Sequence, residues 1–439
     1  MVGKHVLSAL YNCNMNNFNL PRNGKKRIVI VGAGFAGLKL AMRLSGSRFQ
    51  VVMIDKRNFH QFQPLFYQVA TSGIEPSSIS FPVRRIFQKH ANLHFRTTRF
   101  LEVKPDEQMI ITKAGELSYD YLVFATGVKS NYFGKTNIEK FSLPMKSTAE
   151  AIHVRNRILE SFEKAMLTED KKEQSELMSV AIVGGGPSGV ELSGAIAEMK
   201  NNVLFKDYPE LDFSQMKIQL FEAGPRLLSG MSQHSSGKAF RFLLKLGVDV
   251  KLNSHIEDYD GDKILFGDGS TVYCRNFLWT AGVSGLKITG LPDTIYTRGN
   301  RIKVDAFNRI EGFANVFAIG DIAFQTEEKY PNGHPQVAQV AIQQAKNLAS
   351  NLNKGFTKPF KYIDKGSLAT VGRNMAVADL PGFRFSGFFA WMLWLFVHLM
   401  SIVGVKNRIF IFINWAQSYI ARDQSLRVMI KPYPDKRDH

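Results

Sequence analysis

Residues 25–37 read KKRIVIVGAGFAG, and this stretch decides the fold class. A short β-branched run enters a glycine-rich turn, and helix-like sequence (LKLAMRLSG) and a second strand (QVVMID) follow, which predicts a βαβ unit. In the GxGxxG spacing, Gly32 allows a tight turn, Gly34 lets the backbone reach a pyrophosphate, and Gly37 lets helix pack on strand. The pyrophosphate is then expected at the positive end of a helix.

The same pattern returns at residues 179–191, SVAIVGGGPSGVE, followed by a helical segment and the strand KIQLFEA. Here the three glycines are Gly184, Gly186 and Gly189. One such turn is weak evidence, but two in strand–turn–helix context predict two Rossmann-type dinucleotide-binding modules in one α/β chain.

Each module carries an acid where its second strand is expected to end. Asp55 and Glu222 stand at these positions and can accept hydrogen bonds from a ribose. A carboxylate at Glu222 favours NADH over NADPH, although Arg226 nearby weakens this preference.

A hydride donor and its acceptor must meet, so we expect non-covalent FAD in the first module and NADH in the second. Further strands end at YDYLVFATG (119–127), FLWTAGV (277–283) and NVFAIGD (315–321), and Asp321 is expected at the flavin ribityl chain. The predicted cofactor-binding residues are Gly32, Gly34, Gly37, Asp55, Lys56, Gly127 and Asp321 for FAD, and Gly184, Gly186, Gly189 and Glu222 for NADH.

Composition narrows the class of partner. The formal charge is +18, from 56 Lys and Arg against 38 Asp and Glu, which suggests a polyanionic partner. No zinc-finger spacing, RNP signature or basic-region heptad is found, so an anionic membrane surface is preferred to nucleic acid. The two cysteines, Cys13 and Cys274, are far apart, which excludes a disulfide framework, a CxxC pair and a cysteine-ligated cluster. We expect no metal site.

Residues 385–405, FSGFFAWMLWLFVHLMSIVGV, form an apolar run that is long enough in principle to span a bilayer. A helix lying in the membrane interface is favoured by the tryptophans Trp391, Trp394 and Trp415 and by the interspersed basic residues. A transmembrane helix and a buried dimer core remain alternatives.

Several segments resemble type II NADH:quinone oxidoreductases over about residues 26–430. They are HQFQPLFYQVATSGIEPSSISFPVR (60–84), the GGGPSGVE turn, NVFAIGD, VAQVAIQQA (337–345) and AWMLWLFVHLMSIVGVKNR (390–408). The first of these segments is most similar to bacterial members, especially those of the Bacteroidetes type. The resemblance implies a two-dinucleotide-binding flavoprotein fold with a C-terminal membrane-anchoring helical region and monotopic attachment.

The resemblance also implies a quinone site beside the flavin at the AQxAxQ motif, here Ala338, Gln339, Ala341 and Gln343. Two amides one helical turn apart can hydrogen-bond quinone carbonyls without adding charge; the alternative is that they simply face solvent. Glu191 is implied near the reacting groups, where it could relay protons. His398, alone in an apolar run, is either a quinone-site residue or a core histidine with a backbone partner.

The sequence therefore predicts FAD-dependent, non-proton-pumping NADH oxidation that reduces a membrane quinone by a ping-pong-like hydride transfer through flavin N5. Catalytic roles are expected for Glu191, Gln339 and Gln343. The alternatives are an NADH-dependent reductase of a protein acceptor and a low-turnover membrane-bound redox sensor. We expect location on the cytoplasmic face of the inner membrane, and a homodimer through the C-terminal region is left open.

The predicted domains are a disordered extension (1–25), an FAD domain (26–150 and 285–360), an NADH domain (151–284) and a membrane-anchoring region (361–439).

Overall fold

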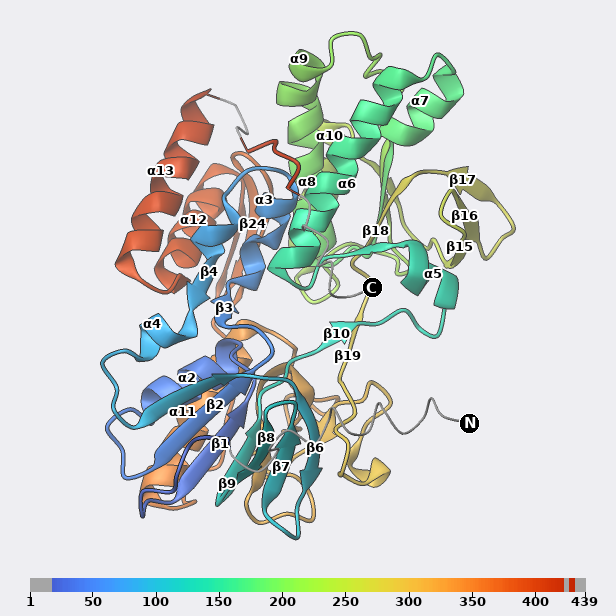
Figure 1. Cartoon of the computed structure of the whole chain (residues 1–439). Coiled ribbons are helices and arrows are strands. Elements are labelled where there is room, and N and C mark those ends of the chain that lie inside the picture. Colours follow the sequence, from blue (N-terminus) through green and yellow to red (C-terminus); the bar gives the residue numbers. More distant parts are fainter. Residues whose placement is uncertain (1–17, 422–425, 431–439) are drawn as a thin grey trace, which may run out of the picture. The chain divides into compact units, whose positions relative to one another are not determined.

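The computed structural model describes residues 18–421 and 426–430 (Figure 1). The chain forms two compact units. The first consists of the described parts of residues 1–60, 81–129 and 283–364, and the second of those of 61–80, 130–282 and 365–439. Residues 61–80 and the described part of 365–439 thus belong to the same unit as the second dinucleotide module. The predicted domains differ, because they place residues 61–80 in the FAD domain and treat the C-terminal segment as a separate region.

The first unit contains a five-stranded parallel sheet with the strand order β21-β9-β1-β2-β5. All five residues of β1 are buried, as expected for a parallel strand covered on both faces. Helix α11 packs against α2. The bounds are β1 (Arg27–Val31), α2 (Phe35–Arg43), β2 (Gln50–Asp55), β5 (Leu93–Thr97), β9 (Tyr121–Phe124), β21 (Val316–Ala318) and α11 (Ala338–Lys354).

A three-stranded antiparallel sheet completes the first unit and shares a hydrophobic core with the parallel sheet. Its strands are β6 (Phe100–Lys104), β7 (Met109–Thr112) and β8 (Gly115–Ser118). The shorter elements of this unit are α4 (Val83–Phe87), η4 (Asp293–Ile295), β20 (Ile302–Lys303), η5 (Gly320–Ile322) and β22 (Ala323–Phe324).

Part of the predicted disordered extension is ordered on this unit. Phe18 is buried in the core cluster, and Gln50 Nε2 donates to the Pro21 carbonyl oxygen at 3.1 Å. Arg22 forms a 2.6 Å ion pair with Asp120. The prediction of disorder is therefore wrong for residues 18–22, because their contacts are made with residues far along the chain that no local pattern reveals. Residues 1–17 lie outside the described residues.

The second unit repeats the parallel sheet, with the order β11-β18-β12-β13-β14. The sheet and its helices comprise β11 (Leu143–Pro144), α6 (Thr148–Leu167), α7 (Lys171–Met178), β12 (Val180–Val183), α8 (Pro187–Met199), β13 (Ile218–Phe221), α10 (Gln233–Leu246), β14 (Asp249–Lys251) and β18 (Asn276–Trp279). An antiparallel sheet follows β14, with β15 (Ile256–Tyr259), β16 (Lys263–Phe266) and β17 (Thr271–Tyr273).

Smaller elements complete this part of the chain. Within the second unit these are η1 (Gln63–Leu65), α3 (Phe66–Ala70), η2 (Pro76–Ile79), α5 (Thr136–Phe141), η3 (Lys200–Leu204) and α9 (Phe205–Asp207). The short strands β3 (Phe59–Gln61), β4 (Ser80–Pro82), β10 (Lys129–Ser130) and β19 (Val283–Ser284) stand where the chain passes from one unit to the other.

The C-terminal segment begins with an antiparallel sheet, which the prediction of a helical region did not include. Strands β23 (Ser367–Gly372), β24 (Met375–Leu380) and β25 (Phe383–Ser386) precede helices α12 (Phe388–Ser401) and α13 (Val405–Ala421). The apolar run at 385–405 is broken at residues 402–404, where Gly404 has φ +85°. Among the described residues, no helix is long and apolar enough to cross a membrane.

Helix α8 lies against β23 at a point where only glycine fits. A Cβ on Gly194 would lie 1.5 Å from the Val371 carbonyl oxygen. Glu191 lies three residues before Gly194 and Glu198 lies four residues after it, and helical spacing places both near the same face. This contact therefore fixes both carboxyl groups beside the C-terminal sheet.

Candidate functional site

The first glycine turn has the geometry of a phosphate-binding turn. Gly32 has φ +110°, and a Cβ there would lie 2.4 Å from the Ala125 carbonyl oxygen, so only glycine is tolerated. A Cβ on Gly37 would lie 1.9 Å from the Gly32 oxygen, which fixes α2 against the turn. Gly34 is the N-cap of α2 without a side-chain cap, and a Cβ on it would meet none of the described atoms within 4 Å. The helix N-terminus therefore presents its N–H groups to a phosphate.

Asp55 is the last residue of β2 and holds this turn in shape. Its carboxylate accepts hydrogen bonds from Ala33 N at 2.7 Å and Arg57 N at 2.8 Å. Lys56 is exposed beside it, and Gly127 follows β9 with φ +66°. His60, which the sequence analysis did not select, is buried with Nδ1 2.8 Å from the Ala33 carbonyl oxygen. These residues fit a dinucleotide such as FAD.

The second turn repeats this arrangement. Gly184 has φ +106°, and a Cβ on Gly189 would lie 1.9 Å from the Gly184 oxygen. Gly186 caps α8, again without a side-chain cap from any described residue. Glu222 follows β13 and accepts from Gly185 N at 2.5 Å and Gly224 N at 2.7 Å.

The Arg226 side chain bonds to the backbone of its own loop. Its guanidinium donates to the carbonyl oxygens of Met231 at 2.8 Å and Ser229 at 2.6 Å. A guanidinium committed to these carbonyls is less available to a 2′-phosphate, so Glu222 is the dominant charge at this strand end.

The turn that carries Asp321 is held by a glutamine outside the predicted set. Gly320 N donates to Gln344 Oε1 at 2.8 Å, and Gln344 Nε2 donates to Gln325 Oε1 at 2.9 Å. Gln344 lies on α11, directly after the predicted Gln343, and is buried. The sequence signal is hidden because several glutamines stand close together on this helix, and their pattern does not reveal which one faces the core.

The four residues of the AQxAxQ motif have different environments. Ala338 and Gln339 are half-buried at the start of α11, and Ala341 is buried. Gln343 makes a reciprocal pair with the Ile363 peptide: Nε2 donates to its oxygen at 2.8 Å, and Oε1 accepts from its nitrogen at 3.1 Å. The Gln343 amide therefore fixes the chain after α11, in addition to any ligand contact.

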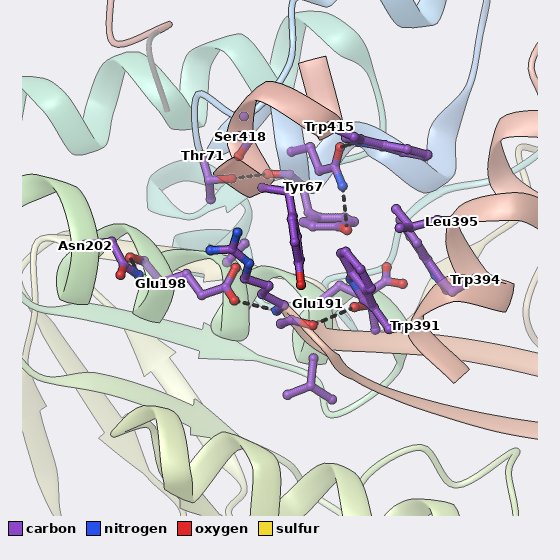
Figure 2. Close-up of a pocket in the computed structure, with 18 of the residues that line it drawn as sticks. Tyr67, Thr71, Glu191, Glu198, Asn202, Trp391, Trp394, Leu395, Trp415 and Ser418 are labelled. Atoms are coloured by element: carbon purple, nitrogen blue, oxygen red, sulfur yellow. Dashed lines mark hydrogen bonds between the residues drawn. The ribbon is translucent and has the colours of Figure 1, made fainter. Parts of the chain in front are cut away.

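A cavity of about 150 Å³ lies within the second unit (Figure 2). Its wall combines α3, α8, β23, α12 and α13, so segments far apart in sequence build it. Figure 2 shows Tyr67 and Glu191 extending into the cavity, with Trp391, Trp394 and Trp415 also around it. On α8 the lining residues are Glu191, Ala195 and Glu198, a spacing of one helix face, and Asn202 lines the cavity from η3.

Glu191 is the predicted catalytic residue that lines this cavity. Burial raises the pKa of Glu191 to about 8, and a Thr370 backbone hydrogen bond and the Trp394 indole offset part of this rise. The carboxyl group is therefore mostly protonated at neutral pH and can donate a proton.

Glu198 is a second buried carboxyl in the same cavity and was missed by the sequence analysis. Its Oε1 accepts from Arg373 N at 2.5 Å. Burial raises the pKa of Glu198, whereas the Arg373 backbone and guanidinium lower it. Its position seven residues after Glu191 is the sequence signal that could have found it.

His398 is a packed histidine with a backbone partner. Its ring stacks on Trp394 at 4.0 Å between centroids, and Nδ1 lies 2.8 Å from the Trp394 carbonyl oxygen. Burial lowers the pKa of His398 to about 4, so the ring is neutral at pH 7. It is not among the described residues that line the cavity.

Helices α12 and α13 expose many large apolar side chains. Such a patch on an otherwise polar fold marks an interaction surface. The exposed members are Phe388, Phe389, Met392, Phe396, Val397, Met400, Val405, Ile409, Phe410, Phe412, Ile413, Tyr419 and Ile420.

Comparison with known proteins gives the class first. A family model described as "Pyridine nucleotide-disulphide oxidoreductase" matches residues 26–345, which agrees with the two parallel sheets and their glycine turns. The thiol pair of a disulphide reductase is not available here, because Cys13 and Cys274 are the only cysteines of the sequence. The Cys274 thiol is buried and donates to the Ser179 carbonyl oxygen at 3.3 Å.

The particular family follows from the C-terminus and the relatives. A model described as "NDH2 C-terminal domain" matches residues 365–423. The type II NADH:quinone oxidoreductase Ndh of Mycobacterium tuberculosis is 33% identical over 418 residues, 90% of this chain and 89% of that protein. That of Haemophilus influenzae is 28% identical and covers 81% and 87%. The chain belongs to the type II NADH:quinone oxidoreductases, so the resemblance and the enzyme class predicted from sequence are confirmed.

Solved structures support the fold. The structure of NDH2 from Plasmodium falciparum in complex with NADH has a TM-score of 0.85 at 22% identity, covering 93% of this chain and all of that one. The sulfide:quinone oxidoreductase from Aquifex aeolicus has a TM-score of 0.69 at 18% identity, covering 91% and 96%. The predicted α/β fold class is thereby confirmed.

Proposed function

We propose that this chain oxidises NADH and reduces a membrane quinone to quinol, with non-covalent FAD at the first glycine turn and NADH at the second. FAD, when bound, takes the hydride from NADH and passes two electrons to the quinone. The overall balance is NADH + H⁺ + quinone → NAD⁺ + quinol. One proton beyond the hydride must therefore be taken up from solution and reach the quinone.

One observation carries this proposal. Helix α8 begins at the second dinucleotide turn, and its second turn bears Glu191, a mostly protonated carboxyl in a cavity lined by both tryptophans and polar side chains. A single rigid helix thus joins the nucleotide-binding turn to a proton donor. Tryptophan walls can contact a flat ring, and the carboxyl group can serve an acceptor that takes up protons as it is reduced.

The amides of the AQxAxQ motif remain proposed quinone contacts. Gln339 and Gln343 lie one turn apart on α11 and can approach carbonyl oxygens, while Ala338 and Ala341 leave room for a flat ring. The Gln343 amide already bonds the Ile363 peptide at both its nitrogen and its oxygen, so a quinone contact at Gln343 would compete with these bonds. The role of His398 is proposed to be support of Trp394, since its ring is neutral and stacked on that side chain.

We propose that α12 and α13 attach the enzyme to an anionic membrane surface at the cytoplasmic side. Their exposed apolar side chains can be buried in the lipid, and the excess of positive charge of the chain attracts anionic lipid headgroups. We also propose that NAD⁺ leaves before the quinone reacts, that the cycle pumps no protons, and that the C-terminal helices allow a homodimer.

Stopped-flow spectroscopy on detergent-purified protein tests the function. NADH should bleach the flavin absorption band rapidly, and a short-chain quinone should restore it rapidly. If NADH bleaches the flavin band rapidly but a quinone does not restore it, the quinone proposal fails and a protein acceptor is favoured. Absence of bound flavin would overturn the proposal. Initial-rate patterns that are parallel in double-reciprocal plots would support the ping-pong order.

A further inference from the structure

A chain of hydrogen bonds links α13 to the cavity through two residues of α3. Trp415 Nε1 donates to Gln68 Oε1 at 2.8 Å, and Gln68 Nε2 donates to the Tyr67 hydroxyl oxygen at 2.9 Å. Tyr67 is 6% exposed, and all three side chains line the cavity. These hydrogen bonds therefore connect α13, one of the two helices with exposed apolar side chains, to the buried phenol of Tyr67.

The direction of these hydrogen bonds is determined by chemistry. An indole N–H can only donate, so it selects the carbonyl oxygen of the Gln68 amide. The amide nitrogen is then turned to Tyr67, whose oxygen acts as the acceptor. The hydroxyl hydrogen of Tyr67 is thereby directed away from Gln68.

Tyr67 keeps that hydrogen at all working pH values. Burial and the charge of Glu191 raise the pKa of Tyr67 well above its usual value. The phenol is thus a hydrogen-bond donor and not a proton source. Its position beside Glu191 in Figure 2 places a permanent donor and a protonated carboxyl in one cavity.

Resting on the proposed function, we propose that Tyr67 donates a hydrogen bond to a carbonyl oxygen of the quinone ring, and that Gln68 and Trp415 orient its O–H. Negative charge grows on that oxygen as the quinone is reduced, so a fixed donor stabilises the transition state more than the ground state. Tyr67 would be a catalytic residue, and Gln68 and Trp415 positioning residues.

The alternative is that these bonds only hold α13 against α3. Tyr67→Phe separates the two possibilities, because it removes the hydroxyl and keeps the ring. We expect the second-order rate of flavin reoxidation by a short-chain quinone to fall roughly 100-fold, while reduction by NADH and reoxidation by ferricyanide stay unchanged. Tyr119→Phe, which removes a buried phenolic hydroxyl in the first unit, is the matched control and should leave the quinone rate unchanged.

A double-mutant cycle tests the positioning role of Trp415. Trp415→Phe should lower the quinone rate about tenfold, since one orienting hydrogen bond is lost. It should have little further effect in Tyr67→Phe, because there is no hydroxyl left to orient. Fully additive losses, or a Tyr67→Phe variant that quinone reoxidises at the wild-type rate, would overturn the inference. Failure of quinone to reoxidise the wild-type flavin would instead overturn the proposed function.

Discussion

At the scale of single residues, the Glu191 carboxyl offers the sharpest test of proton delivery. Its raised pKa, about 8, means that the protonated form prevails below that pH and disappears above it. Flavin reoxidation by quinone should therefore be nearly constant at lower pH and fall as the pH rises through about 8. Glu191→Gln should lower this rate roughly 100-fold and abolish the pH step. Flavin reduction by NADH, measured across the same pH range, serves as the control.

The same group predicts a stability effect. Its pKa is raised from 4.5 to about 8 by folding, so between these values the folded chain binds more protons than the unfolded chain. The free energy of unfolding should therefore fall as the pH rises across that window. Glu191→Gln should make this fall smaller. Urea unfolding at several pH values measures it, and an equal pH slope in both proteins would contradict the assignment.

Gln344 is expected to support the flavin site without touching the reaction. Gln344→Ala would leave the buried Gly320 N–H without its acceptor and would remove the 2.9 Å donor of Gln325 Oε1, at a cost of about 1–3 kcal/mol. We expect a lower free energy of unfolding and weaker retention of FAD during purification. Asn353→Ala is the control on the same helix, because the Asn353 amide donates to the Ala349 carbonyl oxygen one turn earlier at 3.0 Å. That change should affect FAD retention little.

At the scale of elements, the α8–β23 contact should tolerate no side chain at Gly194. Gly194→Ala would force a methyl group to within 1.5 Å of the Val371 oxygen, so the helix and strand must separate. We expect a loss of several kcal/mol in urea unfolding, with a slower quinone reaction because the cavity wall moves. Gly237→Ala in α10 is the matched control, since its Cβ would meet no described atom within 4 Å. That change should stabilise the fold by up to about 1 kcal/mol. Equal effects of both substitutions would contradict the contact.

The elements that the sequence predicts well are those whose physics is local. Gly32 and Gly184 are recognisable because a tight turn before a helix demands glycine, and Asp55 ends β2 as its strand pattern indicates. Tyr67 could not be selected from sequence, because its surroundings come from α12, α13 and β23, which are distant along the chain. Glu198 could be found only through its spacing of seven residues from Glu191. The break at Gly404 was also missed, since uniform hydrophobicity conceals a turn.

At the scale of the whole molecule, the exposed apolar side chains of α12 and α13 and the charge of +18 predict salt-sensitive binding to anionic membranes. Phe396 and Phe412 are 61% and 59% exposed, so their replacement disturbs little of the core. Phe396→Asp and Phe412→Asp should each weaken binding to phosphatidylglycerol-containing vesicles about tenfold or more, since each loses about 1.5–3 kcal/mol of burial.

Leu167→Asp provides the control for that experiment, because Leu167 is 87% exposed at the end of α6, on another element of the second unit. It should bind vesicles like the wild type in a co-sedimentation assay. Binding of the wild type should be weaker to pure phosphatidylcholine and should fall as salt screens the charges. If Leu167→Asp weakened binding as much as Phe396→Asp, the attachment could not depend on the α12–α13 face. If the wild type bound both kinds of vesicle equally, apolar burial alone would account for the attachment, and the basic charge would need another partner.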